Sequence, residues 1–228
     1  MTGSDCPVID AREVTKVFVE GRERVSVLRG ASLSIARGEI VVLEGRSGSG
    51  KTTMLSILGC ILTPTSGQLV VDGERIEPQH PERLPSLRKR AIGFVFQQFN
   101  LFPALSALEN VELALNVKGI HGSAARKEAE RLLVMVGLED RLRFLPRDLS
   151  GGQKQRVAIG RALAGQPPVI LADEPTANLD TEVSAQVLEL FRGLAKSEGR
   201  ALLVVTHDPK VRGIADRVLT MVDGRVLD

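Results

Sequence analysis

The segment Gly45–Thr53 constrains what this chain can fold into more than any other stretch. It reads Gly-Arg-Ser-Gly-Ser-Gly-Lys-Thr-Thr, follows the apolar run Ile40–Leu43, and precedes Met54–Leu58, whose apolar spacing suits a helix packed on a sheet. A glycine-rich loop between a strand and a helix that opens with Lys-Thr is the setting in which G-x-x-x-x-G-K-[ST] indicates phosphate binding. The sequence therefore predicts a nucleoside triphosphate site, rather than a flexible Gly/Ser loop that precedes Lys-Thr by chance.

The residue types in this loop match the chemistry of phosphate binding. Gly45, Gly48 and Gly50 lack a Cβ, so backbone N–H groups can converge on phosphate oxygens. The helix expected to start near Lys51 adds free N–H donors and roughly half a positive charge. Lys51 supplies a full charge for the β- and γ-phosphates, and the Thr52 hydroxyl can ligate Mg²⁺. The predicted nucleotide contacts here are Gly45, Arg46, Ser47, Gly48, Ser49, Gly50, Lys51, Thr52 and Thr53.

Composition limits the classes to which the chain can belong. Its 228 residues suit one large domain or two tightly joined lobes, and 43% hydrophobic with 25% charged residues is ordinary for a soluble globular protein. A net charge of +2 implies no polyanionic partner. No apolar run approaches the ~20 residues of a membrane helix, so we expect membrane contact only through a partner. Cys6 and Cys60 form no CxxC pair, which disfavours a disulfide framework or a cysteine metal site.

Short apolar segments alternate with helical ones, which predicts a mostly parallel sheet covered by helices on both faces. The expected strands are residues 8–19, 25–36, 68–71, 92–96, 169–172 and 202–206, with a closing hairpin over 217–227 and mainly loop with a short helix over 74–90. Helical character dominates from about 99 to 166, where Ser106 and Glu109 have capping-box spacing and Ser123 is expected to open a further helix. We therefore predict a helical lobe at 99–166 inserted into a core formed by about 8–98 and 167–228.

Polar residues follow the apolar strands at the edge where ligands bind in such sheets. Asp173 and Glu174 are adjacent, so their carboxylates cannot point the same way. We assign Asp173 to Mg²⁺ and Glu174 to the attacking water as general base, a role typically worth ~10²–10⁴ in rate. His207 is placed to contact the γ-phosphate and orient that water, and Gln97 is a candidate neutral ligand of the metal. The alternatives are two solvated acids and a structural histidine.

A second candidate anion-binding terminus lies far along the chain. Ser150 precedes Gly151, Gly152 and Gln153 at the start of an expected helix, where a serine cap and two glycines expose backbone N–H groups. Because the first loop already holds the triphosphate, this second segment is predicted to contact the nucleotide of a neighbouring copy. The sequence therefore favours a dimer.

Taken together, these motifs resemble the nucleotide-binding subunit of an ABC transporter over about residues 9–227. The resemblance rests on Gly45–Thr52, Gln97, Leu149–Gln153, Asp173-Glu174, Ala177–Asp180 and His207, in that order. It implies a P-loop NTPase of the ABC ATPase type, with an antiparallel β subdomain beside the core sheet. It also implies that Asp180 lies at the dimer interface and that Phe18, where the family usually has tyrosine, stacks on adenine.

The amino-acid sequences of two segments resemble those of the lipoprotein-releasing and macrolide-exporter (LolD/MacB-like) group. These segments are Ile92–Leu101 and Ala172–Asp180, whereas Arg46 and Cys60 differ from the residues expected in that group. The resemblance implies an ATPase that closes head-to-tail as a homodimer around two Mg·ATP and moves an integral membrane permease. The subunit would then lie at the cytoplasmic face of the inner membrane, held there by the permease.

Two rival functions are weighed against this interpretation. One is an ABC-type ATPase that acts on DNA or ribosomes, but the chain has one motif set, no heptad run and no interleaving of aromatic residues with basic charge. We therefore expect no nucleic-acid partner. The other is a metabolic kinase, which offers no use for the segment Ser150–Gln153.

Overall fold

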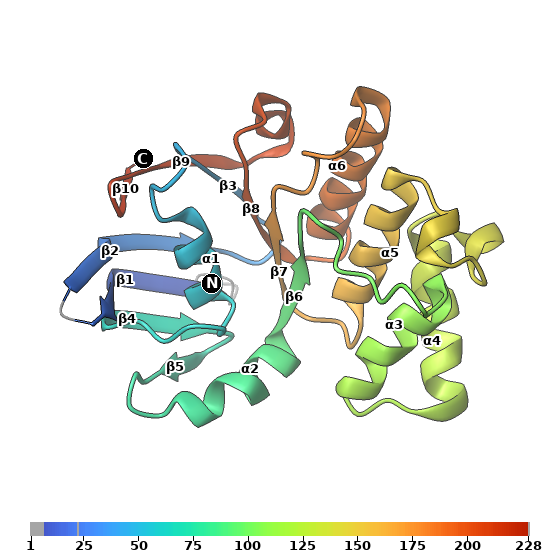
Figure 1. Cartoon of the computed structure of the whole chain (residues 1–228), viewed down its shortest axis with the longest axis horizontal. Coiled ribbons are helices and arrows are strands. Elements are labelled where there is room, and N and C mark those ends of the chain that lie inside the picture. Colours follow the sequence, from blue (N-terminus) through green and yellow to red (C-terminus); the bar gives the residue numbers. More distant parts are fainter. Residues whose placement is uncertain (1–6, 22, 228) are drawn as a thin grey trace, which may run out of the picture.

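The structure is a computed structural model that describes residues 7–21 and 23–227. Its strands form two sheets, and the smaller is a four-stranded antiparallel sheet (Figure 1). The strand order in this sheet is β2 (Glu23–Ile35), β1 (Ile9–Glu20), β4 (Ser66–Val71) and β5 (Glu74–Ile76). It is the antiparallel β subdomain that the sequence predicts.

The larger sheet has six strands. Adjacent strands in it run parallel, except in the hairpin of β9 and β10. Its strand order is β10 (Arg225–Leu227), β9 (Arg217–Val222), β3 (Ile40–Glu44), β8 (Ala201–Val205), β7 (Val169–Asp173) and β6 (Ile92–Val95). The central strands β3, β7 and β8 are continuous apolar runs because both faces of the sheet are covered. The predicted mostly parallel core sheet is thus confirmed.

Helices cover the two faces of the larger sheet unequally. They are α1 (Lys51–Leu58), α2 (Leu84–Ala91), α3 (Ala107–Val117), α4 (Gly122–Met135), α5 (Gly151–Leu163) and α6 (Thr181–Lys196), with 3₁₀ turns η1 (Pro81–Arg83), η2 (Glu139–Arg141), η3 (Pro146–Asp148) and η4 (Pro209–Ile214). Figure 1 shows α1 and the four-stranded sheet on one side of β6 and β7, and α3 to α6 on the other. None of the helices in the described ranges has the length and apolar character needed to cross a membrane.

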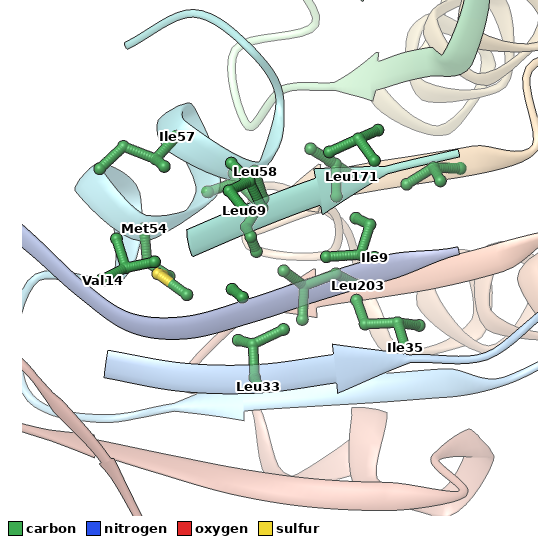
Figure 2. Packing of buried hydrophobic residues seen from close by; sticks show 14 of the residues in the cluster. Ile9, Val14, Leu33, Ile35, Met54, Ile57, Leu58, Leu69, Leu171 and Leu203 are labelled. Atoms are coloured by element: carbon green, nitrogen blue, oxygen red, sulfur yellow. The ribbon is translucent and has the colours of Figure 1, made fainter. Parts of the chain in front are cut away.

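Alternation of side chains along the parallel strands divides the core into two clusters. Leu203 packs with the cluster of α1 and the small sheet, whereas Leu202 and Val204 pack with the helices of the other face. Figure 2 shows the first cluster, which includes Met54, Ile57 and Leu58 of α1 together with Leu33 and Leu69 of the small sheet. Burial of one such side chain contributes about 1.5–3 kcal/mol. This packing holds the segment between β3 and α1 in place.

Two local expectations are wrong in detail. Residues 74–76, expected to be loop, form β5, because Asp72 and Gly73 both have left-handed backbone (φ 48° and 77°) and close a two-residue hairpin. A three-residue strand is too short to show the alternation of apolar and polar residues by which a strand is predicted. The helix expected to open at Ser123 begins at Gly122, with His121 before it. The division into a lobe at 99–166 and a core stays a prediction; α3 to α5 lie within that range.

Parallel strands bring distant segments together at one edge. Gly45, Gln97, Glu174 and His207 each lie within two residues of the carboxyl end of a strand, β3, β6, β7 and β8 respectively. Since the four strands are neighbours that run in the same direction, these residues lie at the same edge of the sheet. The sheet therefore assembles the candidate site.

Candidate functional site

The loop between β3 and α1 is shaped by close backbone contacts. Gly45 has φ 152°, and a Cβ there would lie 2.4 Å from the carbonyl oxygen of Met221, so no larger residue fits without movement. Gly50, with φ 107°, occupies the N-cap position of α1 and provides no side-chain cap. The N–H groups of the first turn of α1 therefore have no capping side chain from Gly50, and the helix terminus favours an anion there.

Lys51 crosses this loop from the first position of α1. Its Nζ donates hydrogen bonds to the carbonyl oxygens of Gly45 (2.7 Å) and Arg46 (3.0 Å). The ammonium group is thus held over the loop, where it adds positive charge to that of the helix terminus. Thr52, the next residue, is exposed.

A cleft of about 770 Å³ lies at this edge of the sheet, within the size range of ligand pockets. It is lined by Val27, Gly45, Arg46, Ser47, Gly48, Gly50, Lys51, Thr52, Thr53, Gln97, Asp173, Glu174, Val205 and His207. The structure therefore brings the predicted loop together with the predicted carboxylates, the glutamine and the histidine. Ser49 is absent from this lining. Its buried hydroxyl has no hydrogen-bond partner in the described chain and lines a neighbouring pocket of about 500 Å³.

The two adjacent carboxylates have different surroundings. Asp173 is the last residue of β7, and burial together with the nearby Glu174 raises the pKa of its carboxyl, while Lys51 opposes the shift. Glu174 follows with φ 45°, a left-handed backbone that is strained for a residue with a side chain, and its N–H donates to Val205 O at 2.8 Å. The left-handed backbone at Glu174 turns the chain where β7 ends.

The Glu174 carboxylate is fixed by two residues that follow β8. Oε1 lies 2.7 Å from Nδ1 of His207, and the hydroxyl of Thr206 donates to Oε2 at 2.9 Å. Thr206 is fully buried, whereas His207 is 76% exposed. Because a carboxylate only accepts, Nδ1 carries the proton in this contact; Nε2 of His207 then accepts from a water in the neutral ring, or donates to a phosphate oxygen in the imidazolium. Thr206 is not among the site residues predicted from the sequence; its position between an apolar strand and His207 was the available signal.

Gln97 enters the same cleft from the loop after β6. Its backbone carbonyl accepts a hydrogen bond from Nδ2 of Asn178 at 3.0 Å. Thr52, Gln97 and Asp173 therefore share one cleft, and their hydroxyl, amide and carboxylate oxygens are the donor types that Mg²⁺ prefers. In the described residues no group of three or more His, Cys, Asp or Glu is arranged to hold a metal. A magnesium ion here would thus depend on phosphate oxygens and water for its remaining ligands.

The segment at Ser150 lies in a different pocket. Ser150 caps α5: its hydroxyl accepts from Gln153 N at 3.3 Å, and Gln153 Oε1 accepts from Ser150 N at 3.0 Å, which completes a capping box. A Cβ at Gly152 would lie 2.2 Å from Cγ1 of Val183, so α5 and α6 approach closely here. Ser150, Gly152 and Gln153 line a pocket of about 370 Å³, which Gly151 does not reach. None of the four lines the first cleft.

Phe18 and Asp180 lie outside both pockets. Phe18 is half-buried on β1, with Nζ of Lys16 5.2 Å from its ring centroid, and Val27 of β2 lines the cleft instead. Asp180 is the N-cap of α6, where its carboxylate accepts from Val183 N at 2.9 Å. Their predicted roles at adenine and at a dimer interface stay predictions.

The family model described as ABC transporter matches residues 28–177, the part of the chain that holds the loop, Gln97, Ser150 and both carboxylates. The chain belongs to the ABC transporter family. It is an ABC ATPase, which confirms the resemblance seen in the motifs, and nothing in the comparisons supports the alternative of an ATPase acting on DNA or ribosomes.

Individual relatives agree with this assignment. The chain is 46% identical over 217 residues to the lipoprotein-releasing system ATP-binding protein LolD of Bordetella avium, which covers 95% of this chain and 94% of LolD. It is 45% identical over 219 residues to the macrolide export ATP-binding/permease protein MacB of Syntrophobacter fumaroxidans; the match covers 95% of this chain but 31% of MacB. The predicted likeness to the LolD/MacB-like group is therefore confirmed.

A solved structure also matches the whole fold. It is a dimeric post-hydrolysis state of the ATP-binding cassette MJ0796 bound to ADP and Pi; MJ0796 is a protein of Methanocaldococcus jannaschii. The TM-score is 0.86 at 42% identity, with 96% of this chain and 97% of that chain covered. The predicted fold class is confirmed at this level of similarity.

Proposed function

We propose that this ABC ATPase works as a homodimer in which two copies close head-to-tail around two Mg·ATP and drive a membrane permease. Each site would combine the Gly45–Thr53 loop of one copy with Ser150–Gln153 of the other. The observation that carries this proposal is the separation of two anion-binding helix termini into two different pockets of one chain. The dimeric form of MJ0796, which is similar over nearly the whole chain, supports the pairing.

Within the cleft each residue is assigned one task. Lys51 and the loop N–H groups bind the β- and γ-phosphates, and Glu174 takes a proton from the attacking water as general base. His207, held by its contact with Glu174, directs Nε2 toward the γ-phosphate and the water. Thr52, Gln97 and Asp173 would hold Mg²⁺, which when bound neutralises charge on the phosphate oxygens. Catalysis is then mainly positioning and charge neutralisation.

Two features support a permease partner and a location at the membrane surface. LolD is named as the ATP-binding protein of a lipoprotein-releasing system, and MacB by its name is both a macrolide export ATP-binding protein and a permease. Phe102, five residues beyond Gln97, leaves half of its apolar surface exposed. We infer that the segment 97–103 and the helices near it contact the permease at the cytoplasmic face of the inner membrane.

The general base is tested with Glu174→Gln, which keeps the shape of the side chain and removes its basicity. Hydrolysis should fall by about 10²–10⁴-fold, while ATP and Mg²⁺ still shift the chain from monomer to dimer in light scattering. Undiminished turnover would exclude Glu174 as the base.

The composite site is tested in the Glu174→Gln background with a matched pair of serine caps. Ser150 caps α5 and Ser106 caps α3 by the same capping box, so Ser→Ala at either position should lower stability by about 1 kcal/mol. Only Ser150→Ala should weaken the ATP-bound dimer, by roughly tenfold, and ATP binding to the monomer should stay unchanged in both. Equal dimer affinities of the two variants would contradict the arrangement.

A further inference from the structure

The loop that carries Gln97 contains strained backbone. Phe99 and Asn100 have φ of 58° and 51°, two successive left-handed residues that both carry a Cβ. Within the loop the described hydrogen bonds run from Phe99 N to Phe96 O and from Asn100 N to Gln98 O. Such a conformation persists only where surrounding groups hold it.

Arg161, in the last turn of α5, holds the strained pair. Its guanidinium donates to Phe99 O at 2.7 Å and also to Asn100 O. No acidic side chain in the described chain forms an ion pair with it, and burial lowers the pKa of this guanidinium. Removing a charge from water with only carbonyl oxygens as partners is unfavourable unless its hydrogen bonds have good geometry. The planar guanidinium of arginine can donate to two neighbouring acceptors at once, which the ammonium group of lysine cannot do in the same way.

Asn178 holds the same loop from the other side of the site. It lies between β7 and α6, four residues beyond Glu174, and its Nδ2 donates to Gln97 O at 3.0 Å. The loop is therefore attached through three carbonyls, one to the β7–α6 segment and two to α5. Arg161 is eleven residues beyond Ser150 on a continuous helix, about 16 Å along its axis.

We propose that Arg161 and Asn178 are positioning residues for Gln97: together they set the place of its side chain relative to Glu174 and to the Ser150 end of α5. The proposal rests on the assignment of Gln97 to Mg·ATP. Neither residue touches the nucleotide in this scheme. A movement of α5 against the β7–α6 segment would displace Gln97, because the loop is attached to both.

The hydrogen bonds that attach the loop to Arg161 and Asn178, here called the tethers, are tested by amide hydrogen exchange of residues 97–101 in the full chain without nucleotide. Arg161→Lys keeps the charge and removes the fork, and Asn178→Ala is an exposed, milder change should the first variant fold poorly. The matched control is Arg200→Lys. Arg200 is buried whereas Arg161 is partly buried, and it too donates to a carbonyl, Pro167 O at 2.7 Å, but at the opposite end of β7 and with an ion pair to Glu198. Exchange in 97–101 should rise about tenfold in Arg161→Lys and Asn178→Ala and stay unchanged in Arg200→Lys. Unchanged exchange in both test variants would overturn the proposal.

The positioning role is tested by the Mg²⁺ dependence of hydrolysis. The Mg²⁺ concentration for half-maximal turnover should rise about tenfold in Arg161→Lys and Asn178→Ala and by less than about twofold in Arg200→Lys, whatever the changes in melting temperature. If the test variants lose thermal stability but keep the wild-type Mg²⁺ dependence, the positioning role is overturned. If the wild-type chain hydrolyses no ATP, the proposed function fails, whereas the exchange experiment still decides whether the tethers exist.

Discussion

Glu174 and His207 are in direct contact, with Oε1 of the carboxylate 2.7 Å from Nδ1 of the imidazole. The contact joins the ends of two neighbouring parallel strands, β7 and β8, at the cleft. Glu174 is 15% exposed and His207 76% exposed, so the carboxylate is sheltered while the ring extends into the opening. The third member of this arrangement is Thr206, whose buried hydroxyl donates to the other carboxylate oxygen. In its proposed role as general base, a carboxylate held at both oxygens needs little reorganisation during the reaction.

The first prediction concerns Thr206. Thr206→Val has almost the same shape but lacks the hydroxyl, so Glu174 loses one donor and the backbone N–H of Asp208 loses its acceptor. We expect kcat to fall roughly tenfold with the KM for ATP changed by less than about threefold, since hydrogen bonds to charged groups contribute about 1.5–3 kcal/mol. Steady-state kinetics measure both, and Thr206→Ser should recover most of the rate. Full kcat in the valine variant would show that Thr206 does not hold the base.

The second prediction compares two glycines of the same loop. Both have positive φ, but a Cβ at Gly45 would lie 2.4 Å from Met221 O, whereas one at Gly48 meets nothing within 4 Å. Gly48→Ala should weaken ATP binding by about fivefold, the effect of roughly 1 kcal/mol of backbone strain. Gly45→Ala should weaken it by well over tenfold, because the loop must move away from β9. Titration with a fluorescent ATP analogue measures both affinities; similar values for the pair would mean that packing against Met221 does not shape the loop.

The third prediction concerns the pH dependence of stability at Lys118. Burial, with a smaller effect from Arg200, lowers the pKa of Lys118 from 10.5 to about 8. Between these pH values the folded chain binds fewer protons at this group than the unfolded chain does. The free energy of unfolding therefore rises with pH between about 8 and 10.5, and this gain is lost as the pH falls through about 8. Lys118→Met should therefore raise the free energy of unfolding at pH 7 by about 1–2 kcal/mol, less than the full pKa shift implies because the side chain is partly exposed. The variant should also show a smaller rise of this free energy above pH 8.

Urea unfolding at several pH values measures this effect. Lys127→Met, on the exposed face of α4, is the matched control and should change the free energy of unfolding by less than about 0.5 kcal/mol at every pH. The interpretation fails if both methionine variants show the wild-type pH profile.

Features that depend on residues close together in the chain were predictable. The capping boxes of Ser106 and Ser150 each join atoms three residues apart, so the spacing of residue types is enough to predict them. The Gly45–Thr53 loop is similar: its chemistry follows from missing Cβ atoms and from one helix terminus. The apolar runs of β3, β7 and β8 indicated strands buried on both faces. The three-residue strand β5 gave no such signal.

Contacts between distant residues were decided only by the tertiary structure. Thr206 and Glu174 are 32 positions apart, and Asn178 and Gln97 are 81 apart. They meet because β6, β7 and β8 are neighbours in the sheet, an order that no local pattern encodes. The burial of Lys118 and the cleft position of Val27, in place of Phe18, likewise follow from packing between elements. The sequence alone thus determined which segments could bind phosphate, since that chemistry belongs to short stretches of backbone. The fold decided which side chains hold them in place, because those contacts exist only once the sheet and helices have assembled.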